Sequence, residues 1–189
     1  DVADFEKMYR IINNDPQNEI LWVPAAAVKK IQKARYAEMV LHEMWCVANL
    51  RIKSVEIQGD SAAVRFHHPE SRIQFEHPWP RPMVTKDGHN SAFYLTNAME
   101  LLDEPGEWYH DIESRKIYYY PRKGEKISKA VVPGIETLVW VEGTIDRPVK
   151  HIRFDNIAFQ YTTWMRPSLQ GHVPLQAGMY MTDGYKIRP

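Results

Sequence analysis

The chain has 189 residues, and 24 Lys plus Arg balance 24 Asp plus Glu, so the formal net charge is zero. That balance excludes a dominant basic surface for nucleic acid and a polybasic membrane anchor. Hydrophobic residues make up 44% and charged residues 25%, which is typical of folded globular proteins and excludes a disordered chain. A single cysteine excludes an internal disulfide and a cysteine-built zinc site. No apolar run approaches about 20 residues, the length that spans a membrane.

The first 35 residues predict a mixed segment of helix and strand. Apolar residues at helical spacing predict a first helix over 5–12, with Asp1 or Asp4 as its cap. A short strand is expected over 19–23. A second helix is expected over 25–33, because a proline precedes it and its residues favour helix.

Residues 36–66 change to the alternation of β-strands. One extended segment is expected from Met39 to Val47, because apolar residues occupy both of its faces. The strand 52–57 alternates, the turn 58–60 contains glycine, and 63–66 returns alongside it. The pattern predicts an antiparallel meander that forms a small sheet or sandwich.

The next sixty residues predict a connection followed by an aromatic hairpin. Residues 67–96 contain several prolines and histidines and are expected to form a long irregular connection. A short helix is expected over 97–102. Strands over 107–111 and 116–120, joined by a turn, would carry several Trp and Tyr side chains.

The last part of the chain has the pattern of short strands separated by tight turns. Strands are expected over 138–143 and 149–161, and the second is interrupted at Asp155 and Asn156. A strand, a corner and another strand are typical of a coil of a parallel β-helix. At most two or three such coils fit before Pro189, so the C-terminal coils are expected to be truncated.

Two runs of residues resemble a family signature. The run Asn97–Tyr109 followed by Lys116–Pro121 is similar to a motif of bacterial right-handed parallel β-helix glycoside hydrolases. The order of 138–143, 151–159 and 162–167 is similar too. The segment Glu38–Trp45 resembles the β-sandwich insertion of these enzymes. The pattern is closest to α-L-fucosidase/xylanase-type and β-xylosidase-type enzymes and covers most of the chain.

The resemblance implies a mainly β fold with two or three short helices. Residues 1–35 would be an entry segment, 36–135 an antiparallel β-sandwich-like accessory domain, and 136–189 the first coils of a right-handed parallel β-helix. It also implies a secreted or periplasmic enzyme that acts on oligo- or polysaccharides without a cofactor. Its catalytic carboxylates would lie on later coils, beyond the end of this chain.

The carboxylates that are present do not form a catalytic pair by spacing. Glycosidases need two carboxyl groups about 5–5.5 Å apart for retention or about 6.5–9.5 Å for inversion. Glu107 and Asp111 are four residues apart on the expected strand, which separates their backbones by about 13 Å. Asp103 and Glu104 precede a proline and are expected to cap a turn. No catalytic residue is assigned.

A metal site is not expected either. His42 and Glu43 begin a pattern that zinc proteases complete with a second histidine four residues after the first, on a helix. Here Cys46 stands in that place and the alternation predicts a strand. A lone cysteine on a sheet is expected to be a small buried hydrophobe.

Aromatic residues give the remaining functional signal, because sugar rings stack on exposed aromatic faces. Core positions are expected for Trp22, Trp108 and Trp140. Trp79 and Trp164 lie in turn-rich segments and are expected to be exposed. Substrate contact is expected for Trp164 with Arg166 first, and less strongly for Trp79 and Gln176.

Two classes of function are consistent with the sequence. The first is a part of a polysaccharide-degrading glycoside hydrolase, inactive alone, that supplies scaffold and substrate contacts. The second is a non-catalytic carbohydrate-binding or structural β module. A β-helix coil with an open edge exposes apolar side chains, so self-association through residues after about 136 is also expected.

Overall fold

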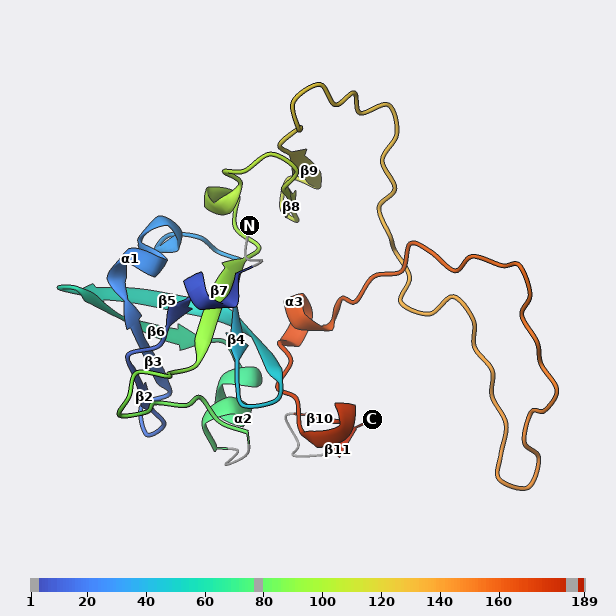
Figure 1. The fold of residues 1–189 in the computed structure, drawn as a ribbon, viewed down its shortest axis with the longest axis horizontal. Coiled ribbons are helices and arrows are strands. Elements are labelled where there is room, and N and C mark those ends of the chain that lie inside the picture. Colours follow the sequence, from blue (N-terminus) through green and yellow to red (C-terminus); the bar gives the residue numbers. More distant parts are fainter. Residues whose placement is uncertain (1–3, 77–79, 183–186, 189) are drawn as a thin grey trace. The chain divides into compact units, whose positions relative to one another are not determined.

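The computed structural model describes residues 4–76, 80–182 and 187–188. The chain divides into two compact units, each described here by itself. One unit comprises Asp1–Glu125 together with Arg166–Pro189, and the other is Lys126–Met165. The fold of the first unit is mainly β, with a curled antiparallel sheet and a few short helices (Figure 1).

Seven strands form the main sheet, in the order β1-β7-β4-β5-β6-β3-β2. Their bounds are β1 (Tyr9–Arg10), β2 (Asn13–Asp15), β3 (Ile20–Pro24), β4 (Glu38–His42), β5 (Val47–Gln58), β6 (Ser61–Phe66) and β7 (Ala92–Thr96). Two further two-stranded sheets pair β8 (Trp108–Asp111) with β9 (Lys116–Tyr119), and β10 (Tyr180–Met181) with β11 (Ile187–Arg188). All of the pairings are antiparallel.

The helices are short and connect or cover the strands. The α-helices are α1 (Ala25–Val28), α2 (Glu70–Glu76) and α3 (Arg166–Gln170). The 3₁₀ helices are η1 (Phe5–Lys7), η2 (Lys29–Ile31), η3 (Met99–Leu101) and η4 (Gln176–Gly178). No helix in the described part of the chain has the length and apolar character needed to cross a membrane.

The N-terminal segment joins both edges of the main sheet. Its first half, β1, pairs with β7, and its second half, β2, pairs with β3. Between them, the Ile11 amide donates to the Ser91 carbonyl at 3.0 Å and the Ile12 amide donates to the Trp22 carbonyl at 2.6 Å. The sheet therefore curls until its two edges meet in one segment, which leaves few unpaired edge groups.

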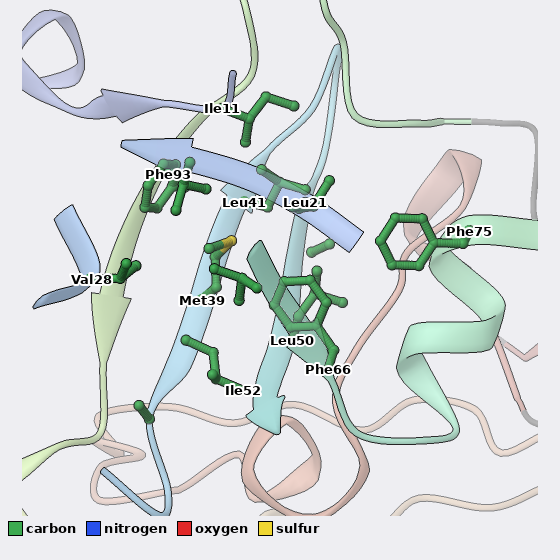
Figure 2. Close-up of a cluster of buried hydrophobic side chains, with 14 of the residues drawn as sticks. Ile11, Leu21, Val28, Met39, Leu41, Leu50, Ile52, Phe66, Phe75 and Phe93 are labelled. Carbon is green, nitrogen blue, oxygen red and sulfur yellow. The ribbon is translucent and has the colours of Figure 1, made fainter. Parts of the chain in front are cut away.

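The core lies inside the curled sheet, under α2 (Figure 2). Met39, Leu41 and Leu50 from β4 and β5 are fully buried. Phe75 projects from α2 toward the sheet, and its ring centroid lies 6.4 Å from that of Phe66. Burial of such side chains contributes about 1.5–3 kcal/mol each, so this cluster is the main stabilising element of the unit.

Several predicted elements are confirmed. The strand expected at 19–23 is β3, and the helix expected after it is α1 followed by η2. The hairpin around Gly59 is β5–β6, with Gln58 opposite Ser61. The aromatic hairpin is β8–β9, with Trp108 opposite Tyr119.

The predicted helix over 5–12 is wrong. Only Phe5–Lys7 is helical, as a single 3₁₀ turn, with Asp4 as its cap, and the chain then extends into β1. Ile11 is buried whereas Ile12 is exposed, which is the alternation of a strand. Over so short a segment the apolar spacing fits the period of a helix and that of a strand equally well. The segment is a strand because it pairs with both edges of the sheet.

The single strand expected from Met39 to Val47 is also wrong. Strand β4 ends at His42, and a tight turn leads into β5, with the Glu43 amide donating to the Cys46 carbonyl at 2.9 Å. Met44 and Trp45 are exposed in this turn. Because Met44 and Trp45 are apolar, the alternating sequence pattern of β4 continues past the end of the strand, and the turn could not be seen in it.

The region 67–96 is more regular than expected. It contains α2, whose buried residues include Ile73 and Phe75, and the strand β7, which lies between β1 and β4 in the sheet. The prolines flank these elements and do not interrupt them, so proline content alone gave a misleading prediction of irregular structure.

The unit Lys126–Met165, all of which is described, contains no helix or paired strand. The segments expected as β-helix strands form no strand there, and Ile152, Phe154 and Ile157 are all about half exposed. The strands of a solenoid coil form hydrogen bonds with neighbouring coils, which one coil alone cannot supply.

Candidate functional site

A groove of about 900 Å³ is a prominent concave site in the described part of the first unit. It lies between β2, the β4–β5 turn, the end of α2 and the segment 80–85. Its volume is near the upper end of the range of about 300–1,000 Å³ that small-molecule sites occupy. Its lining side chains are Asn13, Asn14, Pro16, Met44, Trp45, Gln74, Phe75, Glu76, Pro80, Arg81, Pro82, Met83, Val84 and Thr85.

The β4–β5 turn supplies the exposed apolar wall of this groove. Met44 is 58% and Trp45 is 41% exposed, although both are large apolar residues. A hydrogen bond between the two ends of the turn holds it in place: the Cys46 thiol lies 3.2 Å from Glu43 Oε2. An aromatic side chain is thereby presented at the surface by a tight, hydrogen-bonded turn.

Two amide side chains lie at the floor of the groove. Gln74 is only 1% exposed, and its Nε2 donates to Glu43 Oε1 at 2.7 Å. Gln74 Oε1 and Asn14 Oδ1 are both buried without a hydrogen-bond partner among the described residues. An unpaired buried acceptor costs about 1–3 kcal/mol, so two of them under one groove are exceptional.

Burial has a clear electrostatic effect beneath the turn. Desolvation raises the pKa of the Glu43 carboxyl, and the hydrogen bonds from Cys46 and Gln74 offset this only in part. Desolvation, reinforced by the neighbouring Glu43 carboxylate, also raises the pKa of the Cys46 thiol. Cys46 is half-buried and hydrogen-bonded, and the raised pKa makes it a poor nucleophile.

The opposite wall is fixed by a hydrogen-bonded loop. Asn90 Oδ1 accepts from the Thr85 amide at 2.8 Å, and Asn90 Nδ2 donates to the Ile11 carbonyl at 2.8 Å. Ser91 Oγ accepts from the Met83 amide at 2.9 Å. These bonds tie the groove wall to the edge of the sheet, so the groove is largely preformed.

A second polar cluster lies around Arg51 in β5. Arg51 forms an ion pair with the buried Glu70, and Asn97 Nδ2 donates to the buried Glu38 at 2.9 Å. Burial raises the pKa of Glu38, while hydrogen bonds from Ser168 and Asn97 and the charge of Arg51 act in the opposite direction. Every charged group in this cluster has a partner, which is typical of a structural site.

The structure does not bring the predicted contact residues together as one site. Trp164 is 55% exposed, as expected, in the unit Lys126–Met165. Arg166 begins α3 in the other unit, and its guanidinium lies 3.9 Å from the centroid of the Tyr180 ring. Gln176 is exposed in η4, and Trp79 lies outside the described residues.

The expected core positions of the other tryptophans are mostly wrong. Trp108 is 68% and Trp140 is 76% exposed, and Trp22 is half-buried. Trp108 belongs to the hairpin β8–β9, which is too small to bury both of its faces. The groove residues Trp45, Gln74 and Asn14 were not identified from the sequence, because neither the β4–β5 turn nor α2 was predicted from it.

The carboxylates of the hairpin have local roles. Glu107 Oε2 accepts from the amides of Asp103 and Glu104, and Asp111 Oδ1 accepts from the amides of Glu113 and Ser114. Among the described residues, no group of three or more His, Cys, Asp or Glu side chains could hold a metal ion.

The sequence matches a known domain family over most of the unit that contains the groove. The family described as GH141 insertion domain matches residues 1–122. The chain belongs to this family. A solved structure named "Glycoside hydrolase" is similar to the insertion-domain chain with 70% identity and a TM-score of 0.90. The match covers 100% of this chain and 33% of that one, so the chain spans about a third of the relative. No curated protein matches the chain.

The expectation of a glycoside hydrolase part is therefore confirmed at the level of the family. The matched range ends at residue 122, just after the β8–β9 hairpin of the insertion domain. The segment Arg166–Pro189 belongs to the same compact unit, although it lies beyond the matched residues. The groove lies wholly within the matched range.

Proposed function

We propose that the chain is part of a polysaccharide-degrading glycoside hydrolase of the right-handed parallel β-helix type. Residues 1–35 are its entry segment, 36–135 its accessory β domain, and 136–189 its first β-helix coils. The observation that supports this proposal is the 70% identity over the whole chain with a glycoside hydrolase about three times as long. The substrate class is that of the fucosidase/xylanase-type or xylosidase-type enzymes, and the enzyme acts outside the cytoplasm.

In this proposal the chain supplies scaffold and substrate contacts, and the catalytic carboxylates belong to other parts of the enzyme. The local capping roles of Glu107 and Asp111 support it, because each carboxylate is already held by backbone amides. The exposed Trp164 side chain, together with Arg166, Trp79 and Gln176, is proposed to contact the substrate in the complete enzyme.

A chimera tests the proposal directly. The aligned third of the 70% identical glycoside hydrolase is replaced by this chain, and the chimera, the parent enzyme and the isolated chain are assayed with aryl α-L-fucosides, aryl β-xylosides and xylan. We expect the chimera to retain the activity of the parent enzyme and the isolated chain to show none. Turnover by the isolated chain that a single Asp or Glu substitution abolishes would contradict the proposal.

The alternative function is a non-catalytic carbohydrate-binding or structural module. The groove with an exposed tryptophan is the observation that favours it. A chimera that folds but has lost all activity, combined with oligosaccharide binding by the isolated chain, would favour this alternative over a part of the catalytic machinery.

A further inference from the structure

We propose that the groove bounded by the β4–β5 turn and residues 80–85 binds an uncharged oligosaccharide. Trp45 would supply the stacking face, and the amides of Asn14 and Gln74 would accept hydrogen bonds from sugar hydroxyls. The inference deepens the proposed function, on which it rests, by giving the insertion domain its own substrate-binding subsite.

The exposed wall has the chemistry of a sugar-stacking surface. A pyranose ring presents axial C–H groups that pack on an aromatic face, while its equatorial hydroxyls need polar partners at the rim. Trp45 and Met44 are both exposed at this wall, and Met83 and Val84 line the groove as well. The groove therefore has an apolar side and a polar floor, which match the apolar C–H groups and the polar hydroxyls of a pyranose.

The unpaired acceptors at the floor are the second, independent observation. Gln74 Oε1 and Asn14 Oδ1 have no hydrogen-bond partner among the described residues, and both side chains line the groove. Because Gln74 Nε2 donates to Glu43 Oε1 at 2.7 Å, Gln74 Oε1 is the atom of this amide that lacks a partner among the described residues. Both oxygens are buried in the unbound chain, so binding must involve rotamer changes, which are common at binding sites.

The charges of the lining residues favour a neutral ligand. Among the described residues that line the groove, Glu76 and Arg81 are the charged ones, and their charges are opposite. An acidic saccharide would need several cationic groups, and the cationic Arg51 of β5 is already paired with Glu70. Neutral hydroxyl groups match amide acceptors without an uncompensated charge.

Calorimetric titration of the 189-residue chain tests the inference. The probes are xylohexaose and a fucosylated xyloglucan nonasaccharide, both uncharged, and tetragalacturonic acid as the charged comparison. We expect at least one uncharged probe to bind with a Kd below about 1 mM and tetragalacturonic acid to bind more weakly. Absence of binding by both uncharged probes at millimolar concentration, or preferential binding of the charged one, overturns the inference.

Matched variants locate the binding site. Trp45→Ala is expected to weaken binding about tenfold or more, because buried aromatic contacts dominate such interfaces. Asn14→Ala is expected to weaken it about threefold or more, because it removes Asn14 Oδ1, which has no hydrogen-bond partner among the described residues. Trp108→Ala removes an exposed tryptophan outside the groove and is expected to leave the Kd unchanged.

Folding of each variant is checked by near-ultraviolet circular dichroism and by its urea unfolding midpoint. Folded Trp45→Ala and Asn14→Ala variants that bind as tightly as the unsubstituted chain overturn the assignment of the groove. An active chimera together with a chain that binds neither neutral probe refutes the groove alone and leaves the proposed function standing.

Discussion

Arg51 on β5 and Glu70 on α2 form a two-pronged ion pair, with Nε 2.7 Å from Oε1 and Nη2 2.9 Å from Oε2. Glu70 is almost completely buried, whereas the Arg51 side chain is about a quarter exposed. The remaining Arg51 nitrogen, Nη1, donates to the Leu169 carbonyl in α3 at 2.6 Å. One guanidinium thus links a central strand, a covering helix and the segment that returns after residue 165.

Replacing Arg51 should therefore be far more damaging than replacing an exposed partner of an ion pair. Arg51→Met leaves the Glu70 carboxylate buried and unpaired, which we expect to lower the free energy of unfolding by about 3–5 kcal/mol. The control is Arg35→Met, because Arg35 and Glu113 form an exposed pair, whose loss should change the free energy of unfolding far less. Urea unfolding measures both, and equal effects would show that Glu70 finds another partner.

Gly171 packs closely against Glu70, the buried partner in the same ion pair. Its φ is +66°, and a Cβ built there would lie 2.5 Å from Glu70 Cβ, which α2 and Arg51 hold in place. Gly171→Ala should therefore destabilise the chain and release α3 from β5. Gly178 also has a positive φ, +75°, but nothing lies within 4 Å of its added Cβ.

The matched control is Gly178→Ala, which should cost only the left-handed conformation of an alanine, about 1–2 kcal/mol. The difference between the two unfolding free energies isolates the contact with Glu70. Hydrogen exchange at the His172 amide, which donates to the Asn49 carbonyl, should become faster in Gly171→Ala alone. Equal exchange in both variants would contradict this account.

Buried Glu43 makes the stability of the chain depend on pH. Its pKa is raised in the folded state by desolvation, so the folded chain binds this proton more tightly than the unfolded chain. Stability is then greatest at low pH for this group and falls as the pH rises from the unfolded pKa of about 4.5 through the higher folded pKa.

Glu43→Gln removes the titrating group while it keeps an acceptor for the Gln74 amide. The melting temperature of the variant relative to the unsubstituted chain should therefore increase as the pH rises from 4 to 8. Thermal unfolding at several pH values measures the difference. A difference that is constant with pH, or that shrinks, would rule out a raised pKa for Glu43.

Exposed apolar side chains in Lys126–Met165 predict self-association. Phe154 and Phe159 contact each other edge to face, with ring centroids 5.4 Å apart, yet each remains about half exposed, as does Ile157. Covering each such side chain is worth about 1.5–3 kcal/mol at most. We expect the isolated chain to associate with increasing concentration in sedimentation velocity, and the double variant Ile157→Lys, Phe159→Lys to stay monomeric. A strictly monomeric unsubstituted chain would contradict the prediction.

Local signals in the sequence were sufficient where turn and strand patterns agreed. The β5–β6 hairpin was predictable because Gly59 marks a tight turn between two alternating strands, and Gly59 indeed has a φ of +62°. The aromatic hairpin was predictable because Glu113 and Ser114 lie in a turn between two short strands rich in aromatic residues. The first helix was not, because Ile11 and Ile12 satisfy a helical and an extended period equally well in so short a run.

The groove could not be predicted because it depends on contacts between distant segments. Asn14, Trp45 and Gln74 meet only after the sheet has curled and α2 has packed onto it. Exposed Trp45 continues the apolar alternation of β4, so the sequence pattern conceals the turn that presents it. A buried amide without a partner has no signature in sequence at all.

The link from Arg51 to Leu169 also fixes an order of events during synthesis. The two residues are 118 positions apart, so at about 5–20 residues per second the ribosome takes about 6–24 s to make the chain between them. Every strand of the main sheet and α2 are synthesised by residue 96, before Leu169 is added, so Arg51 still lacks its last acceptor when they are complete. A nascent chain stalled before Leu169 would therefore hold a closed sheet whose β5 strand is still open to chaperones and proteases.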